Sequence, residues 1–181
     1  TVDYNNYYNV SSSNLMQIGA TLYTTSNYKT AFPTGGGANS INKDPLYVSS
    51  TDIHITDGCN NGTNLGLTTD IDGNTRVATP DIGADEIVAS ADNLAMNAII
   101  SPLTNSVSPG PINITVLIKN QGSNTVTTGS VAYILNGGSP VAVSLPSSIA
   151  PCDTLSVTLT GVVMSAGSNS FTVFTSQPTG N

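Results

Sequence analysis

The sequence predicts an all-β chain built from two parts, and its composition supports this in three ways. Helix-forming residues are scarce: the 181 residues include three Met, four Lys and Arg together, and a single glutamate, Glu86. Threonine, whose branched Cβ suits a pleated strand, is abundant, as are asparagine and glycine, which favour turns. Apolar residues make up 38% of the chain and charged residues 8%, which is the composition of a folded chain and not of a disordered one.

Acidic residues and tyrosines divide the chain near residue 88. Nine of the eleven acids and six of the seven tyrosines precede this point. The exceptions are Asp92, Asp153 and Tyr133. Such a change of composition marks a domain boundary. The predicted division is a first domain over residues 1–87, a short linker over 88–91 and a second domain over 92–181.

The second part consists of short predicted strands separated by turns. Apolar and polar residues alternate over 111–119, which places Ile112, Ile114, Val116 and Ile118 on one face. Further strands are predicted over 93–100, 130–135, 141–145, 155–160 and 170–175. Segments rich in Gly, Pro, Asn and Ser separate them. This spacing is typical of an immunoglobulin-like β-sandwich.

Because the chain has no tryptophan, this sandwich is expected to have a mainly aliphatic core. The predicted core residues are Ile114, Val116, Ile134, Leu155, Val157, Phe171 and Val173. The segments 92–94, 116–122, 133–137 and 166–167 resemble the bacterial cell-adhesion-related domain known as CARDB. The chain departs from that family at 150–153, where a glycine is expected before the next strand. The resemblance covers nearly all of the second part and implies a spacer or adhesion module.

The first part is less regular, but four motifs follow one another in a recognisable order. They lie at 42–47, 52–56, 70–76 and 80–86. In this order they resemble the last rungs of right-handed parallel β-helix proteins of the pectate-lyase-like superfamily. The departures are Tyr47 and Ile53, where phenylalanine is usual, and Asp85, where tyrosine is usual. The resemblance implies that residues 1–87 are the end of a right-handed parallel β-helix.

A solenoid rung buries its apolar face only against neighbouring rungs, so three or four rungs are marginal alone. We therefore expect further rungs upstream in a longer protein, and more chain beyond Asn181. The expected partners are other segments of that same protein, with surface glycans and the secretion or anchoring machinery as further candidates.

The motif at 70–76 offers oxygen ligands at the spacing with which a calcium loop begins. The candidate ligands of this structural calcium are Asp70, Asp72 and Asn74. However, Gly73 is fourth instead of sixth, and Asp81 stands where a bidentate glutamate is required. The interpretation we favour is a tight turn whose aspartates accept backbone hydrogen bonds, with Arg76 paired to Asp81 or Asp85. No other cofactor is expected.

Six tyrosines of the first part could form a platform that stacks on carbohydrate or contacts another surface. They are Tyr4, Tyr7, Tyr8, Tyr23, Tyr28 and Tyr47, and the first three are the main candidates. Sugar sites combine aromatic faces with Asn and Asp hydrogen-bonding groups, which are frequent in this segment. The alternative is that the rings stack along the solenoid or cover its edge. In the second part, Thr154 resembles the O-glycosylation acceptor that some bacteria use, an aspartate followed by Ser or Thr and an aliphatic residue.

The remaining candidates do not predict catalysis. His54 alternates with Ile53 and Ile55, which places it on the opposite, solvent-facing side of a strand. It is the single histidine, so no zinc site is expected, and no serine lies in a Gly-x-Ser-x-Gly motif. Cys59 and Cys152 lie in different parts, which favours free or buried thiols over a disulfide.

Composition also bounds the function. A net charge of −7 with four scattered basic residues argues against nucleic acid, and no apolar run reaches the ~20 residues of a membrane-spanning helix. We expect a secreted protein of the bacterial cell surface, in which this chain is a structural and adhesive stalk, spacer or adhesion module. The alternatives are the non-catalytic C-terminal part of a secreted polysaccharide-degrading β-helix enzyme, or a carbohydrate-binding module.

Overall fold

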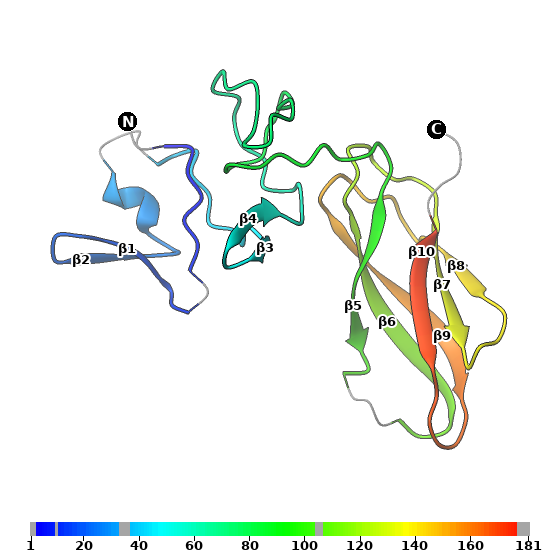
Figure 1. The fold of residues 1–181 in the computed structure, drawn as a ribbon. Helices are drawn as coiled ribbons and strands as arrows, with labels where there is room; N and C mark the ends of the chain where they lie inside the picture. Colours follow the sequence, from blue (N-terminus) through cyan, green and yellow to red (C-terminus); the bar gives the residue numbers. More distant parts are fainter. Residues whose placement is uncertain (1–2, 10, 33–36, 104–106, 177–181) are drawn as a thin grey trace. The chain divides into compact units, whose positions relative to one another are not determined.

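The computed structural model describes residues 3–9, 11–32, 37–103 and 107–176 (Figure 1). Apart from one short 3-10 helix, η1 (Tyr28–Ala31), all regular structure in these ranges is β-strand, so the all-β prediction is confirmed. The chain forms two compact units, Thr1–Val88 and Ala89–Asn181, and their division lies within the expected linker. No helix in the described ranges is long and apolar enough to cross a bilayer.

The second unit consists of two three-stranded antiparallel sheets (Figure 1). The first sheet has the order β5-β6-β9, formed by Leu94–Ser101, Gly110–Asn120 and Thr154–Met164. The second has the order β10-β7-β8, formed by Phe171–Ser176, Ser130–Leu135 and Val141–Ser144. A strand is therefore present at each of the six places where the alternating pattern predicts one.

One apolar core draws side chains from both sheets. Of the predicted core residues, Ile114, Val116 and Val157 are buried, and Leu155, Phe171 and Val173 pack against them. The prediction of Ile134 is wrong. Its neighbours Tyr133 and Leu135 face this core instead, with the Tyr133 ring stacked on Phe171 at 5.5 Å. The alternation of β7 is therefore shifted by one residue from the predicted register.

Strand β9 continues past its predicted end at residue 160 because a bulge resets its alternation. The register with β6 shifts between Ile112 and Ile114, and Gly161 adopts φ +67° in the bulged segment. This left-handed conformation suits glycine, which has no Cβ to clash. Before the bulge Leu159 faces the core, and after it Val162 does. The interior side chains thus change from odd to even positions along one strand.

The turn predicted after β6 is organised by a buried asparagine. Asn120 has no exposed surface, and its Nδ2 donates hydrogen bonds to the carbonyl oxygens of Asn124 (2.8 Å) and Ile149 (2.9 Å). Its Oδ1 accepts from the Gly122 N–H at 2.9 Å. A single side chain thereby joins two loops and gives the buried Gly122 N–H its acceptor.

Replacing Asn120 by leucine is expected to lower the free energy of unfolding of the second unit by about 1–3 kcal/mol, because the buried Gly122 N–H loses its acceptor and two carbonyl oxygens lose a donor. Urea unfolding followed by far-ultraviolet circular dichroism measures the change. The control is Asn124→Leu, since the Asn124 side chain is exposed and the Asn120 contact uses only its carbonyl. Equal effects of the two substitutions would contradict the role given to Asn120.

The first unit contains two small antiparallel hairpins. Strands β1 (Asn14–Ile18) and β2 (Thr21–Thr24) form one, and β3 (Tyr47–Ser49) and β4 (Asp52–Ile55) form the other. The strand predicted over 52–56 is thus present. A parallel bridge joins Asn6 to Ile41. Among the described residues before 89, this bridge is the sole parallel pairing, so the stacked parallel strands of a β-helix are not seen in that range.

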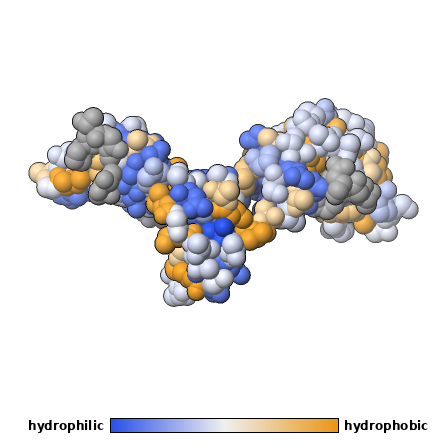
Figure 2. Space-filling view, turned by 90° about the horizontal axis from the view of Figure 1, so that it is seen from above, coloured by the Kyte–Doolittle hydropathy of each residue, from blue (hydrophilic) through white to orange (hydrophobic). Residues whose placement is uncertain are grey.

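The interior of the first unit is mostly polar. Its buried apolar side chains are Tyr28, Ile55 and Pro80, among the residues described. Its buried polar or charged residues are Ser40, Asp57, Asn60, Asp81, Asp85 and Glu86. Large apolar side chains such as Leu65 and Leu67 are instead exposed, at 62% and 67%, and apolar groups are visible at the surface in Figure 2. Hydrogen bonds and ion pairs therefore hold this unit together more than apolar packing does.

Candidate functional site

A pocket of about 650 Å³ opens on the first unit, between the N-terminal segment, the loop that enters β3 and the motif at 80–86. Its walls carry four tyrosine rings, amide and hydroxyl groups, and one carboxylate. The lining residues are Tyr4, Asn5, Asn6, Tyr7, Tyr8, Asp44, Pro45, Tyr47, Ser49, Ser50, Ile82 and Gly83. The structure therefore brings together the three main candidate tyrosines and Tyr47, whereas Tyr23 and Tyr28 are not among the lining residues.

Hydrogen bonds to the segment 41–43 fix the backbone that carries these tyrosines. The Tyr7 N–H donates to the Ile41 carbonyl at 3.0 Å, and the Ile41 N–H donates to the Asn5 carbonyl at 2.8 Å. The Asn6 side-chain amide pairs with both backbone groups of Lys43, at 2.8 and 3.1 Å. An amide side chain that pairs with a backbone in this way replaces the next rung of a β-ladder. The pocket wall is thus held in place at three successive residues.

The Tyr7 ring is used for packing. It stacks on Phe32 with centroids 5.9 Å apart and meets the edge of Tyr28 at 5.8 Å. Tyr28 is itself buried and donates its hydroxyl to the Ser40 carbonyl. For Tyr7, the alternative that the rings stack within the unit therefore describes its contacts better than a ligand-facing role. Offset and edge-on aromatic pairs of this kind stabilise a fold with little aliphatic core.

Tyr8 and Tyr47 offer open ring surfaces, with 41% and 50% of each residue exposed. The Tyr8 hydroxyl donates to Asp44 Oδ2 at 3.0 Å, and this contact with a carboxylate raises the pKa of Tyr8. The other Asp44 oxygen accepts the Leu46 N–H at 2.9 Å. Asp44 therefore orients the Tyr8 ring and the loop leading into β3 at the same time.

The three calcium candidates do not converge on one point: Asp70 and Asn74 contact each other, whereas Asp72 contacts His54. Asp70 accepts hydrogen bonds from the N–H groups of Asp72 (2.9 Å), Asn74 (2.8 Å) and Glu86 (3.3 Å). The Asn74 side-chain amide also donates to Asp70, at 3.2 Å. This is the capped turn that the sequence favoured over a calcium loop. The carboxylate of Asp72 points away from this turn and contacts His54.

Arg76 pairs with Glu86, so the prediction of Asp81 or Asp85 as its partner is wrong. Its Nη1 lies 3.1 Å from Glu86 Oε2, and the two side chains are only 7% and 1% exposed. The guanidinium also donates to four backbone carbonyls. These belong to Thr69, Asp81, Gly83 and Ala84. Glu86 in turn accepts the N–H groups of Val77 and Asp81. The planar fork of arginine, with its five donors, suits such a convergence of acceptors.

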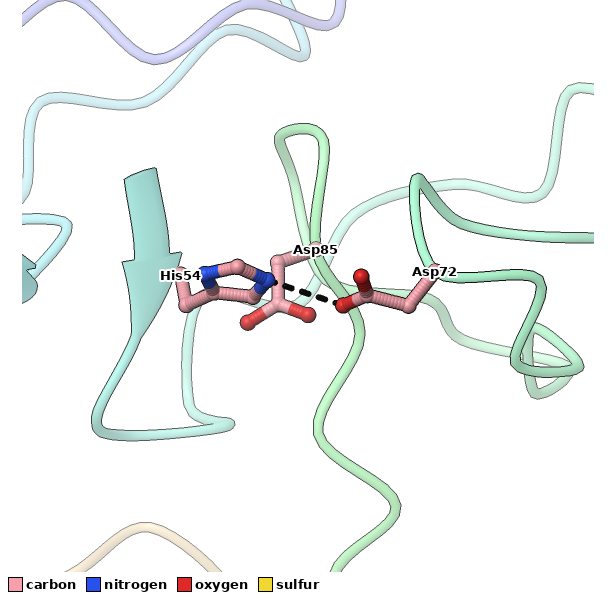
Figure 3. Close-up of side chains that lie close together, drawn as sticks. All are labelled: His54, Asp72 and Asp85. Atoms are coloured by element: carbon pink, nitrogen blue, oxygen red, sulfur yellow. Dashed lines mark hydrogen bonds and ion pairs between the residues drawn. The ribbon is translucent and has the colours of Figure 1, made fainter. Parts of the chain in front are cut away.

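The His54 side chain is 43% exposed, on the solvent-facing side that its alternation with the buried Ile55 predicts, although Ile53 is exposed as well. Its ring also lies against carboxylates, which the alternation does not predict. Its Nδ1 contacts Asp52 Oδ1, and its Nε2 lies 2.9 Å from Asp72 Oδ2. These two acidic partners raise the pKa of His54. Figure 3 shows a third carboxylate, that of Asp85, beside the ring.

Two candidates lie outside this region. Thr154 is exposed at the first residue of β9, where an acceptor hydroxyl is accessible. Neither cysteine is free: Cys59 and Cys152 are both disulfide-bonded, so the interpretation of free or buried thiols is wrong.

Sequence reasoning included Tyr47 among the tyrosines that could contact a sugar, but it missed the carboxylates around His54. Asp72 and Asp85 reach His54 through irregular loops, and no periodic pattern relates these three positions. A comparison of the chain with family models, curated proteins and solved structures finds no match.

Proposed function

We propose that this chain is a non-catalytic, adhesive segment of a large secreted bacterial cell-surface protein, and that its first unit binds glycans in the tyrosine-lined pocket. The observation that carries the proposal is the presence of two open tyrosine faces, Tyr8 and Tyr47, beside amide and hydroxyl groups. Sugar rings have C–H faces that pack on aromatic rings and hydroxyl groups that hydrogen-bond to amides. The pocket offers partners for both.

The charge of the pocket favours a neutral ligand. Asp44 is the one charged side chain among the lining residues, and both of its oxygens already accept hydrogen bonds. An anionic ligand would meet no basic lining side chain, and a cationic ligand would compete with the bonds that hold Tyr8 and Leu46. A neutral glycan disturbs neither.

The proposed architecture is the end of a parallel β-helix followed by an immunoglobulin-like, CARDB-type sandwich. The scarcity of buried apolar residues in the first unit supports stacking on preceding rungs of the same protein. The Arg76–Glu86 network supports a terminal position, because solenoid ends need polar groups that are satisfied locally. The two sheets and shared core of the second unit support its role as a spacer.

The disulfide-bonded state of both cysteines supports secretion, since disulfides persist in oxidising compartments. The surface is also poor in charge, with 8% charged residues in the whole chain. Such a surface presents mainly Ser, Thr and Asn hydroxyl and amide groups. These observations support a location at the bacterial cell surface.

Replacing Tyr8 or Tyr47 by alanine is expected to weaken glycan binding roughly tenfold, because loss of an aromatic contact costs about 1.4 kcal/mol. A glycan array first identifies a bound sugar for the wild-type chain, and calorimetry then measures the Kd of each variant. Tyr8→Phe keeps the ring face and is expected to retain binding.

The matched control is Tyr23→Ala, because Tyr23 lies in β2 and is not among the pocket residues. Its Kd is expected to equal that of the wild type. A blank array, or equal weakening by Tyr23→Ala and Tyr47→Ala, would refute the pocket as a glycan site.

A further inference from the structure

Three side chains with metal-binding atoms converge from separate segments of the first unit (Figure 3). His54 comes from β4, Asp72 from the turn at 70–76 and Asp85 from the motif at 80–86. One nitrogen and two oxygens, one atom from each residue, all lie within 4.8 Å of one another. Ligand atoms around a tetrahedral zinc ion lie roughly 3.4 Å apart at bond lengths of about 2.0–2.1 Å. Small rotations of the two exposed side chains, His54 and Asp72, therefore suffice to close the site.

Asp85 anchors the cluster and is the feature that most needs a cation. The residue is 7% exposed, and its Oδ2 accepts the Ile55 N–H at 2.8 Å. A buried carboxylate is costly unless a positive charge lies beside it. His54 lies beside Asp85, but Asp52 and Asp72 already engage its two ring nitrogens.

Asp52 gives His54 the orientation typical of a metal ligand. Its carboxylate contacts Nδ1, so the proton of a neutral imidazole is held on Nδ1 and the lone pair of Nε2 faces Asp72 and Asp85. Ligating histidines almost always donate their second N–H to a carboxylate or carbonyl in this way. Asp52 is thus a positioning residue and not a ligand.

The negative charge of the cluster also favours a bound cation. Asp52, Asp72 and Asp85 surround one imidazole, so even a protonated His54 leaves an excess of negative charge. A divalent cation bound to a neutral imidazole compensates these carboxylates better than a single proton does. It also places a positive charge beside the buried carboxylate of Asp85.

We propose that His54 Nε2 and the carboxylates of Asp72 and Asp85 bind one divalent transition-metal ion of the zinc class. The imidazole nitrogen favours zinc over calcium. Calcium is bound by oxygen ligands alone, whereas zinc is bound by imidazole nitrogen together with carboxylate oxygen. Three protein ligands leave the fourth position to solvent, and the partial exposure of His54 and Asp72 allows ions to enter. The bound ion would tie β4, the 70–76 turn and the 80–86 motif together.

The test is a calorimetric titration of the chelator-treated full chain with Zn²⁺, and separately with Ca²⁺. The expected result is one Zn²⁺ per chain, with a higher Tm in Zn²⁺ than in chelator, since an ion that binds only the folded state stabilises it. Asp52→Asn is expected to weaken Zn²⁺ binding about 10- to 100-fold, as loss of a partner to a ligating histidine does. His54→Gln, Asp72→Asn and Asp85→Asn are expected to weaken it further.

The matched control is Asp153→Asn, which removes the same charge from an exposed position in the second unit and is expected to leave the Kd for Zn²⁺ unchanged. Because Asp85→Asn also alters a buried hydrogen bond, wild-type chain loaded with Co²⁺ supplies a second measurement. Four-coordinate Co²⁺ with nitrogen and oxygen ligands gives an intense visible absorption that hydrated Co²⁺ lacks. The proposal is overturned by the absence of saturable Zn²⁺ binding, by equal Zn²⁺ affinity of His54→Gln and Asp153→Asn, or by a hydrated Co²⁺ spectrum.

Discussion

Replacing Arg76 by methionine is expected to lower the free energy of unfolding of the first unit by about 3–5 kcal/mol, because it leaves Glu86 charged and buried without its partner. The Glu86 side chain is 1% exposed, so water cannot replace the guanidinium. The substitution also strips hydrogen bonds from four backbone carbonyls of the closing motif. Methionine retains much of the side-chain volume, so lost packing contributes less than lost charge and hydrogen bonds.

Tyrosine fluorescence comes mainly from the first unit, since six of the seven tyrosines lie in it and the chain has no tryptophan. Urea unfolding followed by tyrosine fluorescence and near-ultraviolet circular dichroism therefore measures the first unit. A variant that is already unfolded without urea agrees with the expectation. The control is Lys29→Met, which removes the same charge from an exposed side chain of the same unit and is expected to cost no more than about 1 kcal/mol. A loss below 1 kcal/mol for Arg76→Met would contradict the structural role of the ion pair.

The Arg76–Glu86 ion pair is a feature that the sequence predicts only in part. The motif around Arg76 was identified as a closing turn, and the hydrogen bonds of Asp70 agree with that interpretation. The partner of Arg76 was not predictable, because Asp81, Asp85 and Glu86 lie within six residues of one another. Their assignment depends on which carboxylate the loop turns inward. Nothing in local spacing determines this, since irregular loops lack a repeating direction for their side chains.

The second unit was more predictable because the side chains of a strand point alternately to its two faces. Alternation over 111–119 placed Ile114 and Val116 correctly in the core, and the turn at Asn120 followed from its composition. The errors occurred where a local feature shifts the register. The bulge at Gly161 changes which residues of β9 face inward, so the alternation does not predict the second half of this strand. In β7 the inward-facing residues are Tyr133 and Leu135 instead of Ile134, a shift of one residue.

The candidate sites show the same contrast. Clustered tyrosines near the N-terminus were a sufficient indication of an aromatic surface, but their roles depend on tertiary contacts. Tyr7 packs on Phe32, whereas Tyr8 and Tyr47 stay open. A single histidine without a second histidine or cysteine nearby in sequence gave no reason to expect a metal. The approach of Asp72 and Asp85 to His54 arises from chain folding and leaves no mark in local spacing.

Replacing Leu159 by alanine is expected to lower the free energy of unfolding of the second unit by about 2–5 kcal/mol. Leu159 has no exposed surface and lies in the core that both sheets share. It is also the last inward residue of β9 before the Gly161 bulge, where the strand changes register. Neighbours held by two sheets and a bulge have little freedom to move into the space left by the missing carbons. The cost is therefore expected to include an unfilled cavity as well as the lost transfer free energy.

Val163→Ala is the matched control, because Val163 lies four residues further along the same strand and is 63% exposed. It removes apolar atoms from the same strand without opening a cavity, and is expected to change stability by no more than about 0.5 kcal/mol. Urea unfolding followed by far-ultraviolet circular dichroism compares the two variants, with tyrosine fluorescence as a check that the first unit is unaffected. If Leu159→Ala costs no more than Val163→Ala, the two sheets do not enclose a close-packed core. The spacer role proposed for this unit would then lose its mechanical basis, because a spacer keeps its length only while its sheets stay packed.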